Sequence, residues 1–232
     1  MGLNDFTIKN NVRALPVFIL ADTSGSMDGE KIQALNNALR EMVTSLKSVE
    51  DIRGEFKVGI ITFGGDVILH QELENVEHIS LTELRARGNT PMGAAISLVT
   101  KLINDKSVVP STAYTPTIVL VSDGMPTDIR IEDATFDDYI NWEPIVELQK
   151  AENRASKCLR LAMGIGADAD NNMLRAFVNN SAIPVFKSKD AAGIQSFFKW
   201  VTMSTVSRMT SANPNNTDSI LPDDLIEEDF PL

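Results

Sequence analysis

Five oxygen-bearing side chains stand at positions where a folded chain could bring them together. A run of apolar residues ends at Asp22, and Ser24 and Ser26 follow it at alternate positions. Thr90 and Asp123 come later in two further polar turns. Carboxylate and hydroxyl oxygens, with no soft ligand among them, suit a hard cation such as Mg²⁺, Mn²⁺ or Ca²⁺ rather than zinc. The chemistry that these residues could perform together is therefore the binding of a divalent metal ion.

Apolar runs of strand length alternate with segments of helical periodicity along the chain. The predicted strands cover residues 14–22, 56–65, 67–73, 115–124, 159–166 and 183–188. The predicted helices cover residues 31–49, 90–105, 143–157, 171–178 and 190–209. Such alternation predicts an α/β fold with a doubly wound, mostly parallel central sheet and helices on both faces. The alternating run 67–73 is expected to pair with the strand before it as a hairpin, which makes it one antiparallel edge strand.

This fold explains why the polar turns could meet. Ligands of an open parallel sheet bind beyond the carboxyl ends of its strands. Asp22 and Asp123 each close a predicted buried strand, and Thr90 lies on a loop just before a helix. A simpler interpretation is that these side chains only cap helices, with Thr90 before its own helix and the earlier residues before the helix near Lys31. One capping residue is enough for a helix, so that interpretation leaves two oxygens of the first turn unexplained.

The same residues resemble a known metal site. The segment DTSGS, the later Thr of GNTPMG and the later Asp of VSDG are similar to the metal-ion-dependent adhesion site of von Willebrand factor A (VWA) domains. The likeness extends over residues 10–208. It implies a Rossmann-like VWA fold and Mg²⁺ held directly by the three hydroxyls, with the two carboxylates acting largely through water. One coordination position would then face solvent, where a Glu or Asp of a partner protein could complete the shell.

Within that family, the segments ILADTSGSM, RGNTPMGAA and VSDGMPTD are most similar to the bacterial intracellular TerY branch, which is associated with tellurium resistance. Genes of that branch often neighbour genes for a protein kinase and a PP2C-like phosphatase. The resemblance therefore implies a metal-dependent protein-interaction module in bacterial stress response or defence. A kinase and a phosphatase are its possible partners.

The composition limits the other classes of partner. The 232 residues are 43% hydrophobic and 23% charged, and their formal net charge is −11. Such a negative charge argues against nucleic acid and against an anionic membrane surface as partners. No apolar run reaches membrane-spanning length, and the first residues contain no apolar signal core. A cytoplasmic protein is therefore expected, and its single cysteine, Cys158, is expected to be buried and structural.

One domain over residues 1–210 accounts for all the predicted elements. Residues 211–232 are acidic, contain proline and show no sustained periodicity, which predicts a flexible C-terminal tail. Two smaller expectations concern residues between the strands. Asp128 is expected to cap a following helix or to be solvated, and Tyr139 and Trp142 are expected to pack against the helix after them.

Two alternatives to a binding module follow from the same metal site. The chain could be a Mg²⁺-dependent hydrolase or phosphatase that uses Asp22 as a nucleophile. Such phosphatases need a second acid two residues later, where this sequence has Ser24. The metal could also serve the structure of the loops alone. The two histidines, His70 and His78, stand apart from any triad-like or zinc-like pattern, so no enzymatic activity is predicted.

Overall fold

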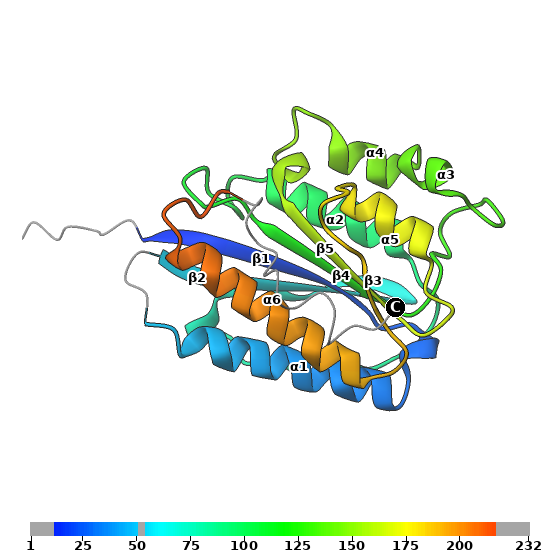
Figure 1. The fold of residues 1–232 in the computed structure, drawn as a ribbon, viewed down its shortest axis with the longest axis horizontal. Helices are drawn as coiled ribbons and strands as arrows, with labels where there is room; N and C mark the ends of the chain where they lie inside the picture. Colours follow the sequence, from blue (N-terminus) through cyan, green and yellow to red (C-terminus); the bar gives the residue numbers. More distant parts are fainter. Residues whose placement is uncertain (1–11, 51–53, 217–232) are drawn as a thin grey trace, which may run out of the picture.

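The computed structural model describes residues 12–50 and 54–216, and their strands form one sheet in the order β3-β2-β1-β4-β5-β6 (Figure 1). The strands are β1 (Arg13–Asp22), β2 (Gly54–Gly64), β3 (Asp66–Asn75), β4 (Thr117–Ser122), β5 (Leu159–Ile165) and β6 (Phe186–Ser188). Neighbouring strands run parallel except β2 and β3, which form an antiparallel hairpin through Gly65 at φ +75°. The predicted mostly parallel sheet with one antiparallel edge strand is confirmed.

Helices cover both faces of this sheet, as predicted (Figure 1). One layer consists of α1 (Glu30–Lys47) and α6 (Ala192–Thr210). The opposite layer consists of α2 (Met92–Asn104), α3 (Phe136–Ile140), α4 (Glu143–Gln149) and α5 (Asn171–Val178). Short 3₁₀ turns lie at η1 (Gly25–Met27), η2 (Val76–His78) and η3 (Arg154–Lys157).

The central strand β1 shows why the chain needs two helical layers. Successive side chains of a strand point to opposite faces of the sheet. Val17 and Ile19 accordingly belong to the core beneath α1 and α6, whereas Phe18 and Leu20 belong to the core beneath α2 to α5. A strand that is apolar on both faces is stable only when both faces are covered. The continuous apolar run before Asp22 therefore leads to a sheet between two layers of helices.

The predicted helix over residues 143–157 is wrong in its second half. Helix α4 ends at Gln149, and Lys150 leaves the helical conformation with ψ at 128°. The side-chain amide of Asn153 then donates to the carbonyl of Glu147 at 2.6 Å, which satisfies an acceptor at the helix end. The guanidinium of Arg154 donates to the carbonyl of Val109 at 2.6 Å. These side-chain bonds hold residues 154–157 as the separate turn η3, and helical periodicity could not reveal them.

Two expectations about individual side chains are confirmed. Tyr139 is fully buried, its hydroxyl donates to Asp170 at 2.6 Å, and its ring meets that of Trp142 edge to face. These aromatic residues therefore pack inside the α2–α5 layer. Cys158 is buried as well, and its burial raises the pKa of the thiol to about 12, so the thiol stays protonated at neutral pH.

The segment that follows α6 begins by folding back on the base of the sheet. Buried Arg208 donates to the carbonyl of Pro214 at 2.9 Å and to the hydroxyl of Thr117 at 2.7 Å. Asn215 accepts a bond from the amide of Thr115 at 2.8 Å. These contacts hold the first residues of the predicted tail, and residues 217–232 lie outside the described part of the chain. No helix among the described residues is both long enough and apolar enough to cross a membrane.

Candidate metal site

The last residue of β1 places a buried carboxylate at the carboxyl edge of the sheet. Asp22 is fully buried, and its Oδ1 accepts a bond from the amide of Ser24 at 2.8 Å. Its Oδ2 accepts a bond from the hydroxyl of Ser122, the last residue of β4, at 2.5 Å. Burial raises the pKa of Asp22 and the nearby charge of Asp123 adds to this, while the bonds from Ser122 and Ser24 act in the opposite direction. The two oxygens of Asp22 thus link the turn after β1 to the end of β4.

The turn after β1 connects Asp22 to the second predicted carboxylate. The hydroxyl oxygens of Ser24 and Ser26 are 3.1 Å apart. The hydroxyl of Ser26 donates to Oδ1 of Asp123 at 2.7 Å, although these residues are 97 positions apart in the chain. Ser24 and Asp123 are buried, whereas Ser26 is exposed. Four of the five predicted site residues therefore form one hydrogen-bonded network at the end of β1 and β4.

The loop that carries Thr90 lies against the same turn. The amide of Gly25 donates to the carbonyl of Gly88 at 3.0 Å. The amide of Thr127, in the loop after β4, donates to the carbonyl of Thr90 at 2.9 Å. Thr90 is buried, yet its hydroxyl makes no hydrogen bond to any residue in the described ranges. The three loops therefore adjoin one another, and the Thr90 hydroxyl is left available to a ligand.

Two glycines allow this close approach of loops. Gly88 has φ at +68°, and a Cβ on it would lie 2.6 Å from the Cα of Gly65, which itself has φ at +75°. Any other residue at position 88 would be strained in its own backbone and would push the hairpin turn away. The sequence reveals both glycines but not that they face each other.

Helix capping does not explain the predicted site residues. Helix α1 begins after Gly29, and α2 begins after Pro91, and in neither case does the side chain of a predicted site residue accept a capping bond from the helix start. The capping interpretation of the first turn and of Thr90 is therefore wrong. Asp128 does act as a cap, but for α2 rather than for a helix that follows it: its carboxylate accepts bonds from the amides of Gly93 at 3.2 Å and Ala94 at 2.9 Å.

We expect Asp128→Ala to lower the free energy of unfolding by about 1 kcal/mol, because two amides at the start of α2 lose their acceptor. The control is Asp168→Ala, since Asp168 is exposed and makes no hydrogen bond within the described ranges. Urea unfolding monitored by circular dichroism measures both variants. Equal stability of the two would contradict the capping role.

The donor set fits a hard divalent cation. It combines two carboxylates with three hydroxyls, and hard cations prefer oxygen ligands of this kind. The described residues contain no group of three or more His, Cys, Asp or Glu side chains that could hold a metal ion, so a site here would depend on the hydroxyls. His70 lies on the edge strand β3 and His78 in η2, where both are outside this network.

Two polar residues of the network were not predicted. Ser122 fixes Asp22, and its only sequence signal is a small polar residue at the end of an apolar strand. Lys31, in the first turn of α1, places its ammonium 2.5 Å from Oδ2 of Asp123 and 3.4 Å from the carbonyl of Ser26. No motif indicates this contact, because it depends on how α1 leaves the turn.

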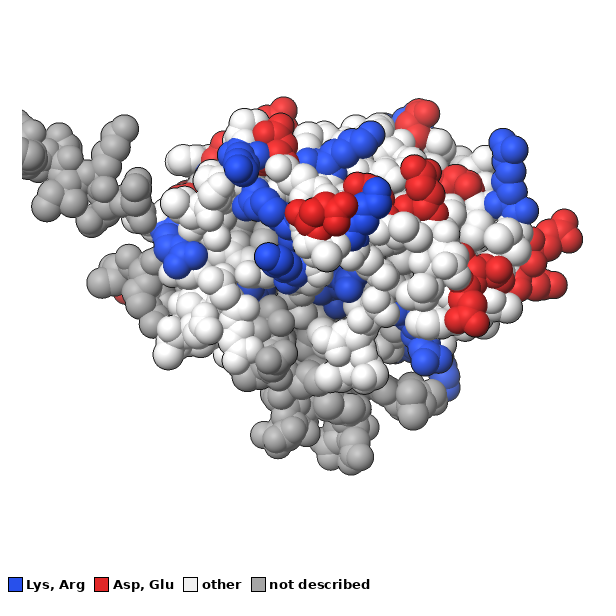
Figure 2. Space-filling view, turned by 90° about the horizontal axis from the view of Figure 1, so that it is seen from above, with Lys and Arg blue, Asp and Glu red and all other residues white. Residues whose placement is uncertain are grey.

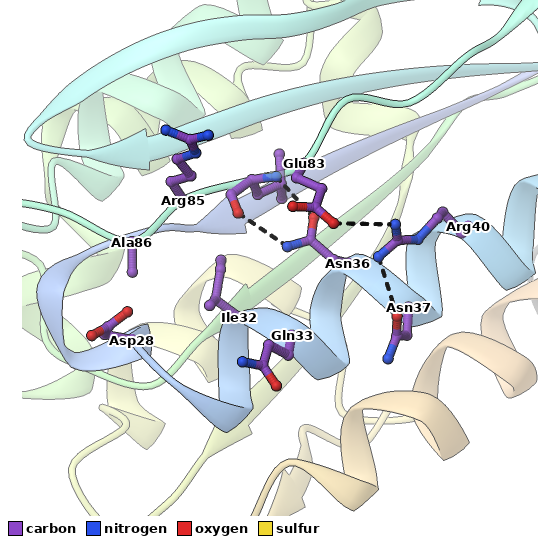
Figure 3. A pocket seen from close by; sticks show the side chains of 10 residues that line it. Asp28, Ile32, Gln33, Asn36, Asn37, Arg40, Glu83, Arg85 and Ala86 are labelled. Carbon is purple, nitrogen blue, oxygen red and sulfur yellow. Dashed lines mark hydrogen bonds and ion pairs between the residues drawn. The ribbon is translucent and has the colours of Figure 1, made fainter.

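A hollow of about 540 Å³ lies beside the turn, between α1 and the extended segment 83–86 (Figure 3). It begins at Asp28, two residues beyond Ser26. Asn36 of α1 holds the segment 83–86 in place across the hollow. Its side-chain nitrogen donates to the backbone carbonyl of Leu84 at 3.0 Å, and its side-chain oxygen accepts a bond from the backbone amide of Leu84 at 2.8 Å. The hollow is lined mainly by polar side chains, and Asp28 is the lining residue that follows the predicted site residues of the first turn most closely in the chain.

Acidic side chains gather on the surface at the end of the molecule where α3 lies, on the right of Figure 2. The connection from β4 to α3 supplies the exposed acids Asp128, Glu132 and Asp133, and the first turn of α3 adds Asp137. An acidic surface repels an acidic partner unless a bound cation reverses the charge locally.

Comparisons with known proteins agree with the fold. Residues 17–125 match the family model of the von Willebrand factor type A domain. Inter-alpha-trypsin inhibitor heavy chain H4 of Sus scrofa is 30% identical over 120 residues, which are 48% of this chain and 12% of that protein. The ArnB paralog VWA2 of Sulfolobus acidocaldarius superimposes with a TM-score of 0.60 at 19% identity, over 82% of this chain and 45% of that one.

A second similar structure is that of the proximal thread matrix protein 1 of the mussel byssus with a zinc-occupied MIDAS motif. It has a TM-score of 0.55 at 16% identity and covers 82% of this chain and 48% of its own. The chain thus spans about an eighth of its curated relative and less than half of these two solved chains. At these identities the structures show a shared fold.

Proposed function

We propose that this chain is a von Willebrand factor type A domain and that it acts as a metal-dependent protein-interaction module. The observation that carries the proposal is the network of Asp22, Ser24, Ser26 and Asp123 at the carboxyl edge of the sheet, with the Thr90 loop bonded against it. Residues 1–210 would form the domain, and residues 211–232 would form a C-terminal tail that is bonded to the base of the sheet through Pro214 and Asn215 and is flexible beyond them.

In this proposal Ser24, Ser26 and Thr90 bind the metal directly, and Asp22 and Asp123 act largely through water. Because hydroxyl ligands are neutral, the bound ion would keep most of its charge and attract an incoming carboxylate. Mg²⁺ is our first choice, with Mn²⁺ or Ca²⁺ as the other oxygen-preferring ions. The zinc-occupied MIDAS motif of the mussel protein supports the idea that this fold can hold a divalent cation at such a motif.

The proposed partner is a protein that offers a Glu or Asp to the metal. The acidic surface of residues 128–137 would repel an acidic partner. The partner would therefore bind at the metal ion, where the local charge is positive. The hollow that begins at Asp28 leaves room for the partner chain to continue beside the metal. The likeness to the TerY branch supports a cytoplasmic role in bacterial stress response, such as tellurite resistance, or in defence, with a kinase and a PP2C-like phosphatase as partners.

A catalytic role for Asp22 has less support than binding. A nucleophile needs an exposed oxygen within reach of its substrate. Asp22 is fully buried, and each of its oxygens already accepts a hydrogen bond, from Ser24 or from Ser122. We therefore propose that Asp22 positions the site rather than reacting.

The test is an affinity pull-down from lysate of the native host. Wild type and Ser24→Ala/Ser26→Ala are each run with Mg²⁺ and with EDTA. Capture of a partner by wild type in Mg²⁺ alone is the expected result, and the partner's identity would show whether a kinase or a phosphatase is involved. The same partner in all four lanes would refute recognition through the metal and would leave a structural role for the ion.

A further inference from the structure

The positively charged side chain of Lys31 lies against one of the two carboxylates of the proposed metal site. The ammonium of Lys31 is 2.5 Å from Oδ2 of Asp123. The other oxygen of Asp123 accepts a hydrogen bond from the hydroxyl of Ser26. The Asp123 side chain is fully buried, whereas 32% of the Lys31 side chain is exposed. Within the described ranges this is the only ion pair that involves either Asp123 or Asp22.

The charge of Lys31 has a consequence for any metal bound nearby. A buried carboxylate without a counter-charge is unfavourable, so the ammonium stabilises Asp123 while no metal is present. A divalent cation among the hydroxyls of Ser24 and Ser26 would lie close to the same carboxylate, because Ser26 contacts it directly. The two positive charges would then repel each other across a partly buried site, where screening by solvent is weak.

The Lys31 side chain is able to move away from Asp123 into solvent. It is a flexible four-carbon chain that begins in the first turn of α1, and because the side chain is already partly exposed, the helix need not move for the ammonium to reach solvent. Its second contact, to the carbonyl of Ser26 at 3.4 Å, is long and easily replaced by water.

We propose that Lys31 is a built-in competitor of the metal: it neutralises Asp123 in the metal-free protein, opposes loading, and so sets the divalent-cation affinity of the site. This inference rests on the proposed metal-dependent function and deepens it. A site weakened in this way would load only when the free cation concentration is high enough to displace the ammonium, and partner binding would follow that threshold.

The experiment is isothermal titration calorimetry of the full chain with MgCl₂ at low ionic strength. We expect Lys31→Met to bind Mg²⁺ about tenfold more tightly than wild type, because a like charge a few ångströms away is removed. Lys31→Arg keeps the charge and should stay near the wild-type affinity. The matched control is Lys47→Met, which removes a lysine from the other end of the same helix and should also leave the affinity unchanged.

Thermal unfolding gives a second readout. In EDTA, Lys31→Met should melt below wild type because Asp123 loses its counter-charge, and saturating Mg²⁺ should remove that difference. An affinity of Lys31→Met equal to or weaker than that of wild type would overturn the competitor role while leaving the metal site intact. If neither protein binds Mg²⁺, Mn²⁺ or Ca²⁺, both this inference and the proposed function are refuted.

Discussion

Ser24→Ala/Ser26→Ala is expected to weaken Mg²⁺ binding by more than about 100-fold. The two hydroxyls are 3.1 Å apart and are two of the three proposed direct ligands. Loss of groups that merely support metal ligands already lowers affinity by about 10–100-fold, so the loss of two ligands should cost more. Isothermal titration calorimetry with MgCl₂ measures the change, because a single titration reports both the affinity and the number of sites.

The matched control for this double variant is Ser45→Ala/Ser48→Ala, at the opposite end of α1 from the turn. It removes two serine hydroxyls from exposed positions, one in the last turn of α1 and one directly after it, and should keep the wild-type affinity. Unfolding in EDTA should show that the Ser24→Ala/Ser26→Ala protein is folded. Mg²⁺ binding at full affinity by that folded variant would exclude the two serines as ligands.

Gly64→Ala is expected to lower the free energy of unfolding by about 3 kcal/mol or more. Gly64 is the last residue of β2, and a Cβ on it would overlap the backbone carbonyl of Thr23. Two hydrogen bonds hold Thr23 in place, so its carbonyl cannot simply move. The carbonyl accepts a bond from the amide of Arg87 at 2.7 Å, and the amide of Thr23 donates to the carbonyl of Phe63 at 3.1 Å. Urea unfolding followed by circular dichroism measures the loss.

Gly124→Ala is the control for this effect. Gly124 follows Asp123 in the same region, has no positive φ, and a Cβ there would meet nothing within 4 Å. Its replacement should change the stability by less than about 1 kcal/mol. The Gly64→Ala protein should also lose Mg²⁺ affinity, because Thr23 belongs to the turn between Asp22 and Ser24. If the two variants were equally stable, tight packing of β2 against this turn would be disproved.

Local pattern predicted most of the fold correctly. The apolar runs became strands because each lies between two helical layers, and the alternating run 67–73 became the antiparallel edge strand β3. The prediction was wrong where side chains from elsewhere interrupt a pattern. Helix 143–157 breaks after α4, where Asn153 and Arg154 bond to backbone carbonyls. The predicted strand 183–188 is also too long, since only Phe186–Ser188 pair with β5 as β6.

The predicted site was assembled in part. Order and residue type indicated the five oxygen ligands, and the structure bonds four of them into one network and places the Thr90 loop against it. Their role as metal ligands remains a prediction. Lys31 and Ser122 could not be predicted, because no motif in the sequence marks either residue as a partner of Asp123 or Asp22.

The sequence by itself determined the type and order of the polar turns and the alternation of strands and helices, because hydrophobic periodicity and residue chemistry are local properties. Only the tertiary structure decided which groups contact the two carboxylates. Ser122 donates a hydrogen bond to Asp22, whereas Asp123 accepts a hydrogen bond from Ser26 and forms an ion pair with Lys31. The tertiary structure also decided that Gly64 and Gly88 must be glycine, since the neighbours that exclude a Cβ come from other loops. Such contacts depend on the register of neighbouring strands and on the path of the connecting loops, and neither is encoded within any one segment.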